Sequence, residues 1–192
     1  MGTFKVDFAL SGAVAWTAPE CREAGVVHIG DTIDSLFESF RSSRTGRFPE
    51  QPALVVGQQS LFDASRAPAG RQTLYCYARS PLRLDIGADA AADLVEERIG
   101  QFAPGFRSLV LARVVRSPDA IEAHDPSMVG GDLGGGSYRL DQQLMLRPHP
   151  RLFRTRTPVH GLYLASASVH PGGGVHGAQG ANAAQFAIRD FG

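Results

Sequence analysis

The sequence predicts an α/β protein with an α+β core, in which a mixed or antiparallel sheet packs against helices. Several segments alternate apolar and polar residues, the pattern of a strand with one buried face. Others place apolar residues at i, i+3, i+4 and i+7, the pattern of a helix with one apolar stripe. Of the 192 residues, 43% are hydrophobic and 20% are charged, so the chain can form one sizeable core and is not expected to be disordered.

The chain opens with a predicted strand at 4–10, where apolar residues alternate with polar or small ones. Asp31 or Thr32 can cap a following helix. The polar segment 41–52, which contains glycine and proline, predicts a loop. We expect the helix to turn one apolar stripe towards the core, formed by Ile33, Leu36, Phe37 and Phe40.

An antiparallel pair of strands is predicted next. Residues 53–56 together with 58–61 form the first strand and 72–78 the second, joined by a connection at 63–70 that contains proline and glycine. In the second strand, one face has Leu74, Cys76 and Ala78, and the other has Tyr75 and Tyr77.

The clearest helix is predicted at 89–102, ending before Pro104-Gly105. Its apolar side is formed by Ala91, Leu94, Val95, Ile99 and Phe102, with Glu96, Glu97 and Arg98 largely off it. A strand at 108–115 follows, and Ser117 then caps a short helix at 119–124.

The last third of the chain is predicted to be mostly irregular. Residues 129–151 form a long glycine-rich loop, a type that is usually functional in a compact domain. A strand at 161–166 and a loop at 167–174 lead to a helix that begins at Val175 or Gly177 and ends at Ile188.

Composition excludes several classes of function. Nineteen basic and nineteen acidic residues give no net charge, which argues against a nucleic-acid or anionic-membrane binder. No segment approaches the ~18 consecutive apolar residues of a membrane span, and no signal peptide is visible, so a cytoplasmic protein is expected. Cys21 and Cys76 should be reduced, with Cys76 in a core strand. Lys5 is the only lysine, and no P-loop is possible.

The motif that indicates chemistry is Gly172-Gly-Gly-Val-His-Gly177, which fits G-x-G-x-x-G between a predicted strand and a predicted helix. A dinucleotide fold would need a further strand with an acidic residue about 20 positions later, and the sequence ends at Gly192. What the motif still provides is glycine backbone that a ligand can approach, and a helix N-terminus that favours an anionic or carbonyl oxygen. A turn without a ligand explains the six residues about equally well.

The wider segment 161–184 resembles the flavin-contacting C-terminal motif of the phytoene desaturase-like FAD-dependent oxidoreductases, within the amine-oxidase-like group. Within this group the chain most resembles the pyridine nucleotide-disulfide oxidoreductase domain-containing branch, and the carotenoid desaturases are more distant. The resemblance extends over nearly the whole chain, through segments 4–8, 58–63, 66–70, 101–106, 129–132 and 156–158.

This resemblance implies the C-terminal half of a two-lobed enzyme that transfers hydride from a small hydrophobic substrate to FAD. Residues 1–158 would be the substrate lobe, and 159–192 would be the strand, loop and helix that return to the FAD lobe. The N-terminal Rossmann part is absent from this sequence, so an N-terminal FAD-binding half or self-association is the expected partner.

The resemblance also implies which residues touch the cofactor. The loop would run along the flavin, with the following helix aimed at the N1–C2=O edge. The residues beside FAD would be Ser166, His170, Pro171, Gly172, Gly173, Gly174 and Val175. Ser166 and Ser168 replace glycines that are frequent in relatives, and no acidic residue lies in this loop to bind a ribityl hydroxyl.

Other candidate residues are fewer. Gly131 and Asp132 resemble a loop between the substrate lobe and the flavin, and Tyr77 is a candidate for lining a cavity. We identify no catalytic residue, which hydride transfer to flavin does not require. A metal site is not expected, because His170 and His176 lack a third ligand nearby.

Two further functions remain open: a binding or interaction module without catalysis and, as the weakest, an independent nucleotide-binding enzyme. We expect the isolated chain not to retain FAD, since the ADP-binding half is missing. We also expect 161–166 and the final helix to be marginal without a partner.

Overall fold

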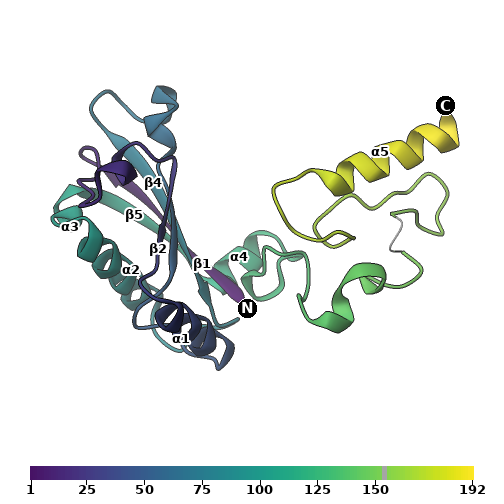
Figure 1. Ribbon diagram of the computed structural model, residues 1–192, viewed down its shortest axis with the longest axis horizontal. Coiled ribbons are helices and arrows are strands. Elements are labelled where there is room, and N and C mark those ends of the chain that lie inside the picture. The colour runs from purple at the N-terminus through teal and green to yellow at the C-terminus, as the bar shows by residue number, and fades with distance from the viewer. Residues whose placement is uncertain (153–154) are drawn as a thin grey trace. The chain divides into compact units, whose positions relative to one another are not determined.

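The computed structural model describes residues 1–152 and 155–192 (Figure 1). These residues form two compact units, Met1–Gly131 and Asp132–Gly192. The division predicted at residue 158 refers to the lobes of a complete enzyme and stays a prediction.

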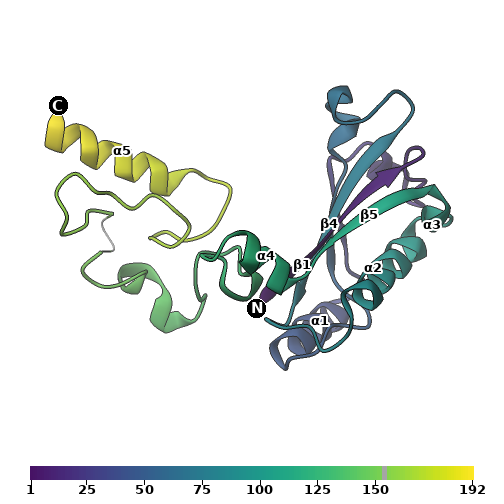
Figure 2. The same cartoon turned by 180° about the vertical axis from the view of Figure 1, so that it is seen from behind.

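A five-stranded antiparallel sheet forms the centre of the first unit, in the order β2-β3-β4-β1-β5. The α/β class with an antiparallel sheet is therefore confirmed, and Figures 1 and 2 show the sheet from opposite sides. The strands are β1 (Gly2–Leu10), β2 (Val26–Ile29), β3 (Leu54–Gly57), β4 (Gln72–Ser80) and β5 (Val110–Arg116). Strand β2 was not predicted, and β3 is shorter than predicted because residues 59–61 form a 3-10 turn.

One face of the sheet forms the core with α2 (Ala88–Phe102). The alternation predicted for β1 and β4 is confirmed, because Phe4, Val6 and Phe8 are buried beside Cys76. Burying each large apolar side chain contributes about 1.5–3 kcal/mol, so this face supplies most of the stability of the unit. Both cysteines are free, as predicted, and burial raises the pKa of the Cys76 thiol far above its ordinary value.

The opposite face, here called the open face, has a row of paired residues across all five strands. The strand register aligns His28, Val55, Tyr77, Lys5 and Arg116. The neighbouring row includes Tyr75 and Asp7, and the two tyrosine rings stack with their centroids 6.4 Å apart. Polar and aromatic groups thus cover this face of the sheet.

Helix α1 (Ile33–Arg44) begins at the Thr32 cap, as predicted, but its orientation differs from the prediction. Ile33 is 85% and Phe37 68% exposed, so the apolar stripe does not face the core. The helix instead turns Ser39 and Ser43 inward. The Ser39 hydroxyl accepts a hydrogen bond from the Ala53 N–H, and the Ser43 hydroxyl donates to a β4 carbonyl. These bonds satisfy backbone groups just before β3 and near the end of β4, which an apolar side chain could not do.

Helix α2 is confirmed, but two charged residues predicted to lie off its buried side are buried. Glu96 accepts hydrogen bonds from Arg113 at 2.7 Å and Arg107 at 3.2 Å, and Arg98 donates to Asp31 at 2.7 Å. A buried charge is tolerated when it is paired, and these pairs explain the difference. After α2 come α3 (Phe106–Leu109) and α4 (Pro118–His124), the latter capped by Ser117 as predicted.

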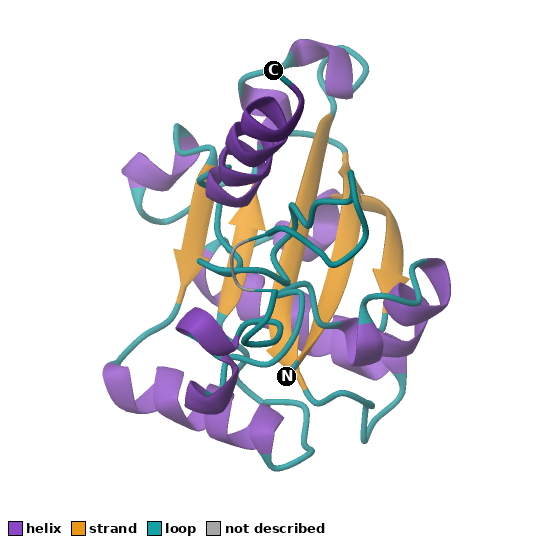
Figure 3. Cartoon of the chain, turned by 90° about the vertical axis from the view of Figure 1, so that its right-hand side faces the viewer, coloured by secondary structure: helices purple, strands orange, loops and turns teal. Residues whose placement is uncertain are grey.

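The second unit contains 3-10 turns and α5 (Ala178–Phe191), and the strands of Figure 3 all belong to the sheet of the first unit. The segment predicted to be irregular, 129–151, contains only short 3-10 turns at Val129–Gly131, Leu140–Gln142 and Leu144–Leu146, so this prediction is confirmed. The strand predicted at 161–166 is wrong, since one isolated bridge between Arg156 and Tyr163 is its only pairing in the described residues. A strand needs a neighbour along its length, and here the described segment 155–157 supplies only two backbone hydrogen bonds, one to the Leu162 carbonyl and one from the Leu164 N–H. No helix in the described ranges is long and apolar enough to cross a bilayer.

Candidate functional site

The residues predicted beside a cofactor form one continuous loop in the second unit, residues 166–175, which leads into α5. Pro171, Gly174 and Val175 are exposed, whereas Gly172 is buried. Asp132 begins the same unit. Tyr77 and Gly131 belong to the first unit, and the substrate-contacting role of these three candidates stays a prediction.

The three consecutive glycines of this loop differ in what a side chain would meet there. Gly172 has φ +98°, a conformation that residues with a Cβ rarely adopt. A Cβ on Gly173 would collide with the hydroxyl of Tyr138. By contrast, a Cβ on Gly174 would meet only the exposed ring of His176, 2.6 Å from its Cδ2 atom. A side chain at Gly174 would therefore displace an exposed ring and no backbone atom.

A buried arginine, Arg147, holds loop 166–175 in place through hydrogen bonds to backbone carbonyl oxygens. The Arg147 side chain donates hydrogen bonds to the carbonyl oxygens of Ala167 (2.8 and 2.9 Å), Ser137 (2.9 Å) and Gly134 (2.7 Å). The residue is 2% exposed, and its Nε lies 3.5 Å from where a Cβ of Gly172 would be. Arg147 thus ties loop 166–175 to the 134–138 segment and places a positive charge beneath the glycines.

Sequence reasoning missed Arg147. Arginine is usually exposed, and this one lies in an irregular segment without periodicity. Only its burial and its carbonyl partners distinguish it from the other arginines of the chain.

The loop has backbone donors that are free. Within the described chain, the N–H groups of residues 173–177 have no hydrogen-bond partner, while the Gly172 N–H donates to Val169. Gly177 caps α5 without a side-chain bond, and the Ala178 N–H donates to Nδ1 of His176 at 3.1 Å. Free N–H groups together with the positive end of a helix can hold an anionic or carbonyl oxygen.

Two further side chains shape this loop. Gln179 is buried and donates to the Gly172 carbonyl, so the first turn of α5 holds the centre of the loop. The Ser166 and Ser168 hydroxyls bond to each other at 2.5 Å. The loop contains no acidic residue, so these two hydroxyls are groups through which its side chains could accept a hydrogen bond from a ribityl hydroxyl.

Asp132 and Gly131 make local contacts, and their roles as site residues stay predictions. Asp132 accepts a hydrogen bond from the Gly134 N–H at 2.8 Å, which is a local turn. Gly131 is buried against Pro118, where a Cβ would lie 2.7 Å from Cα. The described residues contain no group of three potential metal ligands around His170 or elsewhere.

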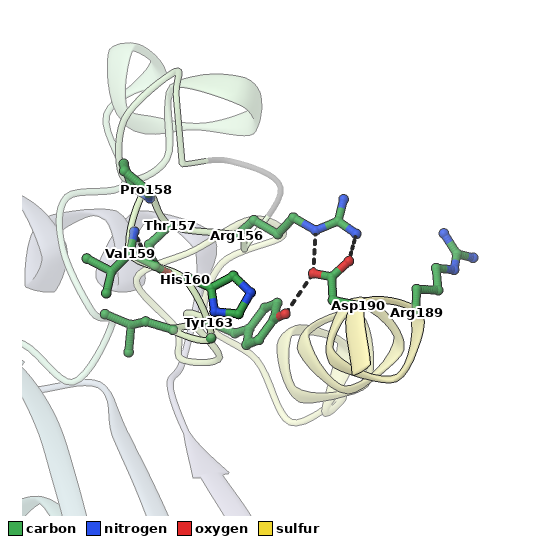
Figure 4. Close-up of a pocket in the computed structure, with 10 residues that line it drawn as sticks. Arg156, Thr157, Pro158, Val159, His160, Tyr163, Arg189 and Asp190 are labelled. Carbon is green, nitrogen blue, oxygen red and sulfur yellow. Dashed lines mark hydrogen bonds and ion pairs between the residues drawn. The ribbon is translucent and has the colours of Figure 1, made fainter. Parts of the chain in front are cut away.

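At the other end of α5 lies a cavity of about 580 Å³ that the sequence did not indicate (Figure 4). Asp190 binds the guanidinium of Arg156 at 2.6 and 3.0 Å and accepts the Tyr163 hydroxyl at 2.7 Å. These two donors, with Arg156 the stronger, hold the pKa of Asp190 below its ordinary value. The cluster joins segment 156–163 to α5, and we assign it a structural role.

Comparison with known proteins shows relatives over most of the chain. It is 32% identical over 183 residues to pyridine nucleotide-disulfide oxidoreductase domain-containing protein 2 of Rattus norvegicus, covering 90% of this chain and 31% of the relative. The Mus musculus protein of the same name is 34% identical over 164 residues, 81% of this chain and 28% of the relative.

A more distant relative is the neurosporene-forming phytoene desaturase of Rhodobacter capsulatus. It is 30% identical over 141 residues, 68% of this chain and 25% of the relative. The chain therefore spans about a third or less of the length of these relatives. No protein-family model matches it.

Proposed function

Because the chain belongs to the phytoene desaturase-like family that includes pyridine nucleotide-disulfide oxidoreductase domain-containing protein 2, we propose that it is part of an FAD-dependent oxidoreductase. In this proposal, loop 166–175 contacts the flavin. The free N–H groups of residues 173–177 support it, since they fit a ligand that presents an oxygen edge with negative charge.

When bound, FAD would accept a hydride from the substrate, and the chain's own groups would favour negative charge beside the loop. The N-terminus of α5 contributes about 0.3–1 kcal/mol to such a charge, and up to about 2 kcal/mol where it is partly buried. Arg147 adds a buried positive charge beneath Gly172. The Gln179 side chain donates to the Gly172 carbonyl and so ties the loop to the first turn of α5.

The open face of the sheet is the proposed contact surface for the substrate. It presents the stacked rings of Tyr75 and Tyr77, a broad aromatic surface suited to an apolar molecule. The Rhodobacter capsulatus relative is named for phytoene, a hydrocarbon, which supports an apolar substrate for this chain. A small hydrophobic molecule is therefore the proposed hydride donor.

The test replaces Gly174 by valine in the chain combined with the polypeptide that supplies the ADP-binding half. The branched side chain would fill the space beside the loop, and the nearest atoms that its Cβ displaces belong to the exposed ring of His176. Flavin content should fall to background, measured by absorbance after gel filtration. His176→Gln should keep most of the flavin, because the glutamine amide oxygen can also accept the hydrogen bond from the Ala178 N–H that Nδ1 of His176 accepts.

Gly180→Ala is the matched control, since a Cβ at Gly180 meets no atom within 4 Å and alanine suits a helix. It should retain flavin at the level of the unmodified chain. If Gly174→Val binds flavin equally well, the loop does not contact the cofactor. The chain would then be a non-catalytic binding or interaction module derived from the same fold.

A further inference from the structure

A groove of about 450 Å³ lies in the first unit between α1 and the open face at β3 and β4. Its walls include the half-exposed side chains of Leu36 and Phe40, together with Val55 and Tyr77 of the open face. This volume is within the range of about 300–1,000 Å³ that is typical of small-molecule sites. Two residues of the apolar stripe of α1, Leu36 and Phe40, thus line this groove instead of packing in the core.

A glycine permits this wall. A Cβ on Gly30 would lie 2.6 Å from Cδ2 of Leu36, so a side chain at position 30 would displace Leu36 from its place against the end of β2. Leu36 is 38% and Phe40 40% exposed, which leaves apolar surface accessible to a ligand. A larger residue at position 30 would push Leu36 into the groove.

One charged group determines which ligand fits. Arg79 is half-buried and lines the groove, and no aspartate or glutamate is among the lining residues. Within the described chain, the Arg79 guanidinium forms no ion pair or side-chain hydrogen bond, whereas arginines such as Arg98 and Arg113 are paired. The other ionisable groups of the groove are the His28 imidazole and the Tyr77 hydroxyl. The groove is thus apolar with an unpaired positive charge.

We infer that this groove binds an apolar molecule with one anionic end, its chain against Leu36, Phe40 and Tyr77 and its carboxylate on Arg79. The inference rests on the proposed function, because it narrows the apolar substrate to a long-chain acid. An anionic acceptor on a guanidinium forms a charge-assisted, two-pronged hydrogen bond, which gives the site its orientation.

The experiment titrates the chain, without FAD, with dodecanoate and with dodecanol by calorimetry, below the concentrations at which either aggregates. Dodecanoate should bind, and Arg79→Gln should weaken it about tenfold or more, the usual value of a hydrogen bond to a charged group. Dodecanol should bind the unmodified chain about tenfold more weakly and be insensitive to the substitution.

Arg116→Gln is the matched control, since Arg116 lies on the same open face but outside the groove. Gly30→Leu should also weaken the binding of dodecanoate, because the new side chain would push Leu36 into the groove. Circular dichroism checks that each variant is folded. The inference is overturned if dodecanoate does not bind, if Arg79→Gln binds it as well as Arg116→Gln does, or if dodecanol binds equally tightly. Because no flavin is present, these outcomes are independent of the Gly174→Val result.

Discussion

Replacing Arg147 by methionine should release the glycine-rich loop while the rest of the chain stays folded. Methionine has a similar length and suits a buried position, but it leaves the carbonyl groups of Ala167, Ser137 and Gly134 without their donor. Each lost partner costs about 1 kcal/mol, so opening of the loop should become easier by about 3 kcal/mol. Removing the buried charge offsets a part of this cost.

Hydrogen exchange measures this effect directly. The Gly172 N–H is bonded to the Val169 carbonyl at 2.8 Å, and its exchange should accelerate by about two orders of magnitude, since each 1.4 kcal/mol is a factor of ten. Exchange at Cys76 in β4 should not change. Arg139→Met is the control, because that arginine is exposed and its one ion pair within residues 1–152 and 155–192 is with Asp141. Unchanged exchange at Gly172 in Arg147→Met would refute the role assigned to Arg147.

Three further outcomes are expected. Phe37→Ser should change the free energy of unfolding by no more than about 0.5 kcal/mol because Phe37 is exposed, whereas Ile99→Ala in the core should cost about 2–5 kcal/mol in denaturant titrations. The pKa of Asp190 is lowered mainly by Arg156, so ionised Asp190 stabilises the contact between segment 156–163 and α5 above the ordinary carboxyl pKa, and this stabilisation is lost as the pH falls through the lowered pKa. Acid should therefore accelerate amide hydrogen exchange in α5. Asp190→Asn should abolish this pH dependence. Cys76 should react with a maleimide only in denaturant, because burial raises the pKa of its thiol.

The elements predicted correctly from the sequence are those whose apolar residues face the core in the structure. Strands β1 and β4 alternate apolar and polar residues and form the centre of the sheet, and α2 has an apolar side long enough to be unambiguous. In α1 the same reasoning found the helix and its Thr32 cap but not its orientation. Periodicity identifies an apolar face, whereas the inward side is decided by backbone groups that Ser39 and Ser43 satisfy.

For the candidate site, the glycines at 172–174 could be located from the sequence, because residues without a Cβ are conspicuous. The residue beneath them could not, since nothing in the order of amino acids separates Arg147 from the exposed arginines. The strand predicted at 161–166 shows the same limit. Its apolar residues suit a strand, but pairing depends on a neighbour elsewhere, and in the described chain only Tyr163 makes a bridge.

The single lysine of the chain has a practical consequence. Lys5 lies on the open face, where its amine is 2.5 Å from the Asp7 carboxylate. Apart from the terminal amine, an acylating reagent therefore has one side chain to modify, and the product would bear its label beside Tyr77. A fluorophore or cross-linker attached there would sit at one known position on the sheet. Its quenching, protection or cross-linked product would report whatever molecule or polypeptide covers that face.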